Sequence, residues 1–66
     1  MNKLLPNGRG EYDVIDDSGA LVGVLRHHWQ GFGWDWIPLD GEPMRGWVEE
    51  DAFTFAQEWT PGRKTR

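Results

Sequence analysis

The chain has 66 residues, no cysteine and a formal net charge of −4 at pH 7. This length allows one domain that buries only about 60% of its unfolded surface, and the lack of cysteine excludes disulfides and thiolate metal sites. No run approaches the ~20 apolar residues of a membrane span, and no secretory signal is visible. We therefore expect a cytoplasmic protein without membrane contact.

The two ends of the chain differ from its middle. Residues 1–10 contain Pro6, Gly8 and Gly10 without a hydrophobic period, which predicts a flexible N-terminal arm. A single domain is expected over residues 11–60, followed by a basic tail over residues 61–66. The eleven acidic residues all lie in the middle part with only two arginines, so its net charge is −9. This acidic body disfavours nucleic-acid binding.

Two strands joined by a tight turn are predicted over residues 11–28. Residues 11–16 alternate in polarity, which is typical of a strand. Residues 16–19 have turn-forming side chains, and Gly19 suits a left-handed conformation. Residues 21–25 then begin a β-branched strand that runs toward His28. Gly23 inside it indicates a bulge or a close approach of another group to the backbone.

A third strand and a short fourth strand follow. Residues 29–31 predict a second turn. In residues 32–37, Phe32, Trp34 and Trp36 alternate onto one face of a strand, which ends at Pro38. Residues 39–43 contain an Asp-Gly turn signal, and residues 45–48 predict the fourth strand.

A helix is predicted over residues 49–59. Three acidic residues occupy its first turn, where the helix dipole favours negative charge. Apolar residues recur with helical spacing on one face, namely Val48, Ala52, Phe55, Ala56 and Trp59. The alternation from Phe53 to Phe55 leaves a strand as the competing interpretation.

These elements predict an α+β fold, a three- or four-stranded antiparallel β-meander with one C-terminal helix packed on one face. The alternative is an SH3-like small barrel, which the short strands, the aromatic content and the segment 46–48 suggest.

No group of residues indicates catalysis, a metal or a cofactor. His27 and His28 are neighbours on a strand and point to opposite faces. Ser18 lies in a turn without a neighbouring base. The acidic pairs are explained by the turn at 16–17 and by the first turn of the helix. We therefore predict that the protein is not an enzyme and has no metal, catalytic or cofactor-binding residue.

The aromatic residues are the strongest functional signal. The chain has nine of them, five being tryptophan, and eight lie between Trp29 and Trp59. One sheet face and one helix stripe offer too few core positions for all eight, so some rings must stay partly exposed. We expect a core that includes Trp34, Trp36, Trp59, Val14, Leu21 and Phe55. Exposed tryptophan with arginine is typical of interface hot spots. The candidate interaction surface comprises Trp29, Phe32, Trp47, Phe53, Arg26, Arg45, Glu49, Glu50 and Asp51.

The pattern resembles small uncharacterised proteins of actinobacteria and their phages. The resemblance lies in residues 12–24, with an Asp-x-x-Gly turn, in Trp34, and in residues 46–53, a Gly-aromatic-x-x-acid-acid-Ala entry into a final helix. It covers roughly residues 11–59 and implies no established activity. Many such phage proteins are expected to bind host proteins, which would place this chain in the host cytoplasm. The chain is less similar to the arm-binding domains of phage integrases, because its strands are acidic where those are basic.

The function expected from these observations is a non-enzymatic module that binds a protein partner through an aromatic and acidic surface. A homodimer formed through the exposed sheet face or sheet edge would also cover surplus tryptophan. Three alternatives stay open. One is an acidic inhibitor that mimics nucleic acid, and another is a weak nucleic-acid binder that uses basic tails and aromatic stacking. The third is a binder of a small ligand or peptide that uses Trp34 and Trp36.

Overall fold

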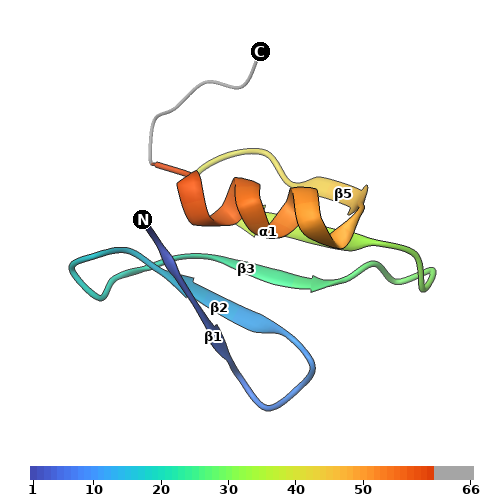
Figure 1. Ribbon diagram of the computed structural model, residues 1–66, viewed down its shortest axis with the longest axis horizontal. Coiled ribbons are helices and arrows are strands. Elements are labelled where there is room, and N and C mark those ends of the chain that lie inside the picture. Colours follow the sequence, from blue (N-terminus) through green and yellow to red (C-terminus); the bar gives the residue numbers. More distant parts are fainter. Residues whose placement is uncertain (61–66) are drawn as a thin grey trace.

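An antiparallel sheet and one helix make up the part of the protein that the computed structural model describes, residues 1–60. The strands pair in chain order, so the sheet is a simple meander whose edges are β1 and β5. Helix α1 lies across one face of this sheet (Figure 1). The elements are β1 (Lys3–Pro6), β2 (Tyr12–Ile15), β3 (Leu21–His27), β4 (Trp34–Pro38), β5 (Met44–Trp47) and α1 (Glu49–Glu58).

The predicted α+β meander with a C-terminal helix is confirmed, but the expected strand count is wrong. The sheet has five strands instead of three or four, and it is open, unlike an SH3-like barrel. Residues 49–58 form a helix, as predicted, and not the competing strand. The third predicted strand begins at Trp34 instead of Phe32, because Gly31 and Gly33 both adopt positive φ angles in the preceding loop.

The extra strand lies within the first ten residues, where we expected a flexible arm. In β1, Leu4 pairs with Val14 and Pro6 pairs with Tyr12 of β2. A four-residue strand is too short to show a hydrophobic period. Pro6 is tolerated because β1 is an edge strand, where a missing backbone donor breaks no ladder. The predicted basic tail, residues 61–66, lies outside the described residues.

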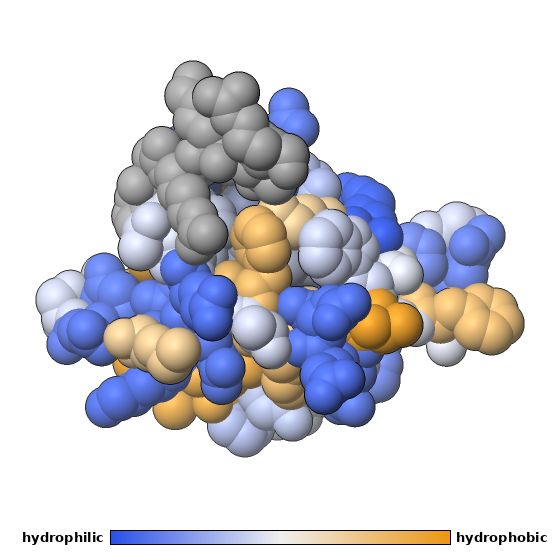
Figure 2. Space-filling view, turned by 45° about the horizontal axis from the view of Figure 1, so that its top comes forward, coloured by the Kyte–Doolittle hydropathy of each residue, from blue (hydrophilic) through white to orange (hydrophobic). Residues whose placement is uncertain are grey.

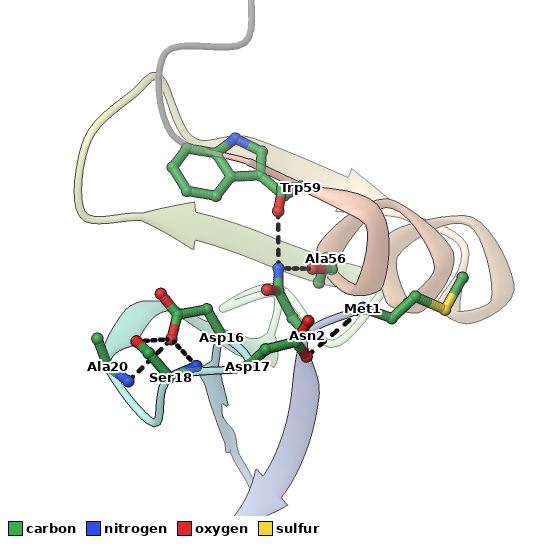
Figure 3. Close-up of polar contacts among 8 residues, drawn as sticks. All are labelled: Met1, Asn2, Asp16, Asp17, Ser18, Ala20, Ala56 and Trp59. Atoms are coloured by element: carbon green, nitrogen blue, oxygen red, sulfur yellow. Dashed lines mark hydrogen bonds and ion pairs between the residues drawn. The ribbon is translucent and has the colours of Figure 1, made fainter.

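Asn2 joins the start of the chain to the end of α1. Its side-chain Nδ2 donates to the carbonyls of Ala56 at 2.9 Å and Trp59 at 2.8 Å, and its backbone N–H donates to Gln57 at 2.9 Å (Figure 3). The last carbonyls of a helix have no partner within the helix. Asn2 therefore supplies donors to three carbonyls at this end of the helix, of which that of Ala56 also accepts the Trp59 N–H at 3.4 Å.

Three tryptophans fill the space between the sheet and α1, as the sequence predicted. Trp34, Trp36 and Trp59 are all buried. The rings of Trp36 and Trp59 meet edge to face with centroids 5.8 Å apart, a favoured aromatic geometry. The remaining members of the buried core are Val14, Val22, Leu25, Ala52 and Ala56.

Gly23 makes room for the Trp36 ring. A Cβ atom at Gly23 would lie 2.7 Å from the Ile37 carbonyl oxygen and closer still to the end of the Trp36 indole. The close approach that Gly23 indicated in the sequence is therefore confirmed. A register shift also occurs here, because Val14 pairs with Gly23 while the next residue, Ile15, pairs with Leu21.

Two residues expected on the buried side are exposed instead. Leu21 is 44% exposed, because the register shift makes the next residue, Val22, the core member. Val48 is also exposed, since it precedes α1 in an extended conformation at the N-cap position. Phe55 is half-buried and packs against the core.

We predict that Gly23→Ala lowers the free energy of unfolding by at least about 2 kcal/mol, because overpacking forces the Trp36 ring or its strand to move. Urea denaturation followed by tryptophan fluorescence measures this change. Gly10→Ala is the matched control, since a Cβ there meets open space and the cost is limited to the left-handed backbone, about 1 kcal/mol. Equal effects of the two substitutions would contradict the packing role of Gly23.

We predict that Asn2→Ala lowers the free energy of unfolding by about 1–2 kcal/mol, because the carbonyls of Ala56 and Trp59 lose their side-chain donor. The same denaturation experiment applies. Gln57→Ala removes an amide from the same end of the helix, but from an exposed position, and we expect it to change stability by less than about 0.5 kcal/mol. If Asn2→Ala has no larger effect than this control, the capping role is wrong.

Candidate functional site

The connection between β3 and β4 forms a short, internally bonded loop, here called the hairpin tip (residues 28–33). The backbone N–H of His28 donates to the Gly33 carbonyl at 3.1 Å, and the Gly31 N–H donates to the His28 carbonyl at 2.8 Å. Gly31 has a φ of +86°, a conformation that glycine adopts without steric cost. The loop is therefore held by its own backbone.

The hairpin tip presents two aromatic side chains to solvent. Trp29 is 77% exposed and Phe32 is 79% exposed. Figure 2 shows this loop projecting beyond the body of the molecule, with hydrophobic surface at its extremity. These two exposed rings are three positions apart. They do not contribute to the core and are available for contact with another molecule.

Trp47 and the start of α1 lie at the same end of the molecule as the hairpin tip (Figure 1). Trp47 pairs with Trp34 and is partly exposed, while its ring meets Phe55 edge to face at 5.8 Å. The backbone of Gly33 lies against residues Gly46 and Trp47, so that a Cβ at Gly33 would collide with them. The acidic residues Glu49, Glu50 and Asp51 are all exposed on the first turn of α1.

A buried carboxylate anchors the hairpin tip to the sheet. Asp35 of β4 is 0% exposed. Its Oδ1 accepts a hydrogen bond from the Gly46 backbone N–H at 2.9 Å and lies 2.8 Å from Nδ1 of His28. Because an ionised carboxylate only accepts hydrogen bonds, Nδ1 of His28 must hold the proton. Asp35 thus ties the base of the hairpin tip to β5.

The other oxygen of Asp35 faces two arginines. Oδ2 lies 3.8 Å from Nε of Arg26 on β3 and 3.7 Å from an amino group of Arg45 on β5. Oδ2 is buried without a hydrogen-bond partner among the described residues. The carboxylate therefore receives hydrogen bonds on one side and only charge attraction on the other.

These surroundings set the ionisation of Asp35. Burial acts to raise its pKa, but the Gly46 N–H, the His28 hydrogen bond and the attraction of His28 and Arg45 together outweigh burial. The pKa of Asp35 consequently lies below the ordinary value of 3.8, so the buried carboxylate is charged at neutral pH.

The structure places the residues of the predicted interaction surface in three groups. Trp29 and Phe32 form the exposed hairpin tip, Arg26 and Arg45 meet at Asp35, and Trp47 lies beside the acidic first turn of α1. Phe53 differs from the others, because its half-buried ring packs edge to face on Tyr12 at 5.2 Å and Trp34 at 4.9 Å.

Sequence reasoning missed the pairing of His28 with Asp35. In the sequence, His28 was considered only beside its neighbour His27. Among residues 1–60, no three histidine or acidic side chains gather as a metal site would require. A signal was present nonetheless, since Asp35 lies between two buried tryptophans, where an acidic residue needs partners.

A shallow groove lies at the opposite end of the sheet, and the polar side chains of Asn2, Asp16, Asp17 and Ser18 that line it are already engaged in hydrogen bonds or ion pairs (Figure 3). Asp16 Oδ1 accepts hydrogen bonds from the Ser18 hydroxyl at 2.6 Å and from two backbone N–H groups, which lowers the pKa of Asp16. Asn2 is used at the end of α1, and Asp17 lies 3.6 Å from the Met1 amino group. The groove therefore serves as a structural junction.

Searches against protein-family models, curated proteins and solved structures find no match to the chain. Within residues 1–60, no helix is long and apolar enough to cross a membrane.

We predict that Asp35→Asn lowers the free energy of unfolding at neutral pH by about 3 kcal/mol, because it leaves the arginines and the Gly46 N–H around a site without its charge. The pKa of Asp35 is lower in the folded chain than the ordinary value of 3.8. Its stabilising contribution is therefore complete above that value and is lost as the pH falls through the folded pKa.

The difference in stability between the wild type and Asp35→Asn should accordingly shrink as the solution is acidified below pH 3.8. Urea denaturation at a series of pH values measures it. Asp40→Asn, at an exposed turn position, is the control and should match the wild type at neutral pH. A neutral-pH stability of Asp35→Asn equal to that of the wild type would show that the carboxylate is not an anchor.

Proposed function

We propose that this chain is a small, non-enzymatic interaction module that binds a protein partner through the hairpin tip, with Trp29 and Phe32 as its anchoring side chains. The observation that supports this most directly is their exposure, 77% and 79%, on a loop held by its own hydrogen bonds. Tryptophan is among the residues that contribute most to binding energy when an interface covers them.

The hydrogen bonds that hold the loop favour binding. Ordering a flexible loop on association costs about 0.5–1.5 kcal/mol for each immobilised side chain, in addition to backbone entropy. Backbone hydrogen bonds within the hairpin tip and the His28–Asp35 contact beneath it already hold the loop backbone in the free protein. Less backbone entropy is therefore lost when a partner binds. A larger share of the free energy gained by burying the two rings then contributes to the affinity.

The acidic first turn of α1 would influence the choice of partner. Glu49, Glu50 and Asp51 lie at the same end of the molecule as the hairpin tip (Figure 1). Charges at the rim of an interface mainly change the association rate and exclude like-charged partners. A partner with basic residues around an apolar pocket fits this arrangement. If the chain is phage-encoded, as its pattern suggests, the partner is a host protein.

Self-association is a distinct proposal that uses different surfaces. The edges of the sheet, β1 and β5, have no neighbouring strand among the described elements. A second copy that pairs at an edge would bury backbone groups and leave the hairpin tip free. Analytical ultracentrifugation of the wild type measures this directly.

We predict that the double variant Trp29→Ser with Phe32→Ser folds with unchanged stability but loses at least about 100-fold in partner affinity, since each hot-spot ring contributes about 2 kcal/mol or more. Capture from host lysate with wild-type bait identifies the partner, and calorimetry with that purified partner measures the affinity. Leu39→Ser is the matched control, because it removes an exposed apolar side chain that follows the opposite end of β4 from the hairpin tip.

Equal affinity of the wild type and the double variant would disprove the role of the hairpin tip. Equal losses of affinity in the double variant and in Leu39→Ser would show nonspecific hydrophobic binding instead of a defined site. A wild-type dimer that the double variant abolishes would identify the partner as a second copy of the chain.

A further inference from the structure

The two arginines of the acidic body come together, although they are distant in sequence. Arg26 and Arg45 are the only lysine or arginine residues between positions 11 and 60, where the net charge is −9. They lie on β3 and β5, the two strands that flank β4, and both approach the same carboxylate oxygen of Asp35. The fold thus brings together the two basic side chains of residues 11–60.

Most of the donor capacity of these arginines is unused. Their distances to Asp35, 3.8 Å and 3.7 Å, exceed hydrogen-bonding length, and neither guanidinium donates a hydrogen bond to a residue of the described part of the chain. The side chains are 46% and 50% exposed. Each guanidinium has five N–H donors in a planar fork. The pair therefore presents open donors to solvent above a single buried negative charge.

Anchoring Asp35 does not account for this arrangement. The carboxylate is already fixed through Oδ1 by the Gly46 N–H and by His28. Counted over these three side chains, two guanidinium groups beside one carboxylate carry a net charge of +1. That charge attracts a second anion, which would lie between the two forks and complete their hydrogen bonds.

The arginine pair is continuous with the aromatic hairpin tip. The His28 ring, bonded to Asp35, has its centroid 6.0 Å from that of Trp29. Arg26 precedes Trp29 by three residues, which corresponds to roughly 10 Å along a strand. One short segment of a partner can therefore reach both.

We propose that Arg26 and Arg45 form a carboxylate-binding site that receives an acidic side chain from the partner segment that covers Trp29. This inference rests on the proposed function of the hairpin tip. A planar carboxylate matches the guanidinium fork in bidentate geometry. The body's charge of −9 repels an extended polyanion, so an isolated carboxylate fits better than a nucleic-acid backbone.

The first test uses small probes. The peptide acetyl-Leu-Glu-Leu-amide is titrated into labelled protein while the side-chain Nε–H signals of Arg26 and Arg45 are followed by NMR. Acetyl-Leu-Gln-Leu-amide is the matched neutral probe, and inorganic phosphate and a single-stranded oligothymidylate are the other arms. We expect the Glu peptide to shift both signals, and the Gln peptide to shift neither.

Equal shifts with the Glu and Gln peptides, or none with either, would overturn the proposal. Stronger effects of phosphate or of the oligonucleotide than of the Glu peptide would also overturn it, in favour of a phosphate site.

The second test uses the captured partner. The double variant Arg26→Lys with Arg45→Lys keeps both charges beside Asp35, so the fold is retained, but it removes the planar forks. We expect about a tenfold or greater loss of partner affinity, with an unchanged unfolding midpoint. Arg9→Gln, at an exposed turn position, should bind like the wild type.

The outcomes separate this inference from the function on which it rests. If the lysine variant binds normally while Trp29→Ser with Phe32→Ser does not bind, the carboxylate site is wrong and the hairpin tip stands. If both variants bind normally, the proposed function fails as well.

Discussion

The buried carboxylate of Asp35 is the interaction on which the arrangement of the candidate site depends. It accepts the Gly46 N–H from β5, holds His28 at the base of the hairpin tip, and faces Arg26 and Arg45 from the neighbouring strands. An unpaired carboxylate at this depth would cost several kcal/mol. The loop and the edge strand are therefore held by one buried negative charge, and the two arginines lie beside it.

The opposite face of the sheet carries the core that stabilises this small chain, which has no disulfide. Trp36 and Trp59 supply the buried area that a longer chain would obtain from many aliphatic residues. Their size imposes its own conditions. Gly23 must lack a side chain, and the indole N–H of Trp36 remains without a partner among the described residues. A few large rings thus fill the core at the cost of one unsatisfied donor.

The sequence was most informative at positions where the residue type by itself indicates one structural role. Gly23 indicated close packing, and the acidic run at 49–51 predicted the start of a helix, because in both cases local chemistry decides. It failed for β1, whose four residues become a strand only by pairing with β2, and for Leu21, which a register shift moves out of the core. The convergence of Arg26 and Arg45 was likewise inaccessible, because adjacency across strands depends on register.

The division of the tryptophans between core and surface follows from these constraints. Trp34 and Trp36 alternate around Asp35, so the strand that buries both rings also aims its carboxylate at the other face. The same strand therefore packs the core on one side and organises His28 and the arginines on the other. Trp29 lies beyond its end, on a loop that this carboxylate holds in place. The backbone that carries the exposed ring is held by its own hydrogen bonds and by the buried carboxylate beneath it, so a partner that covers Trp29 meets a loop already positioned by the fold.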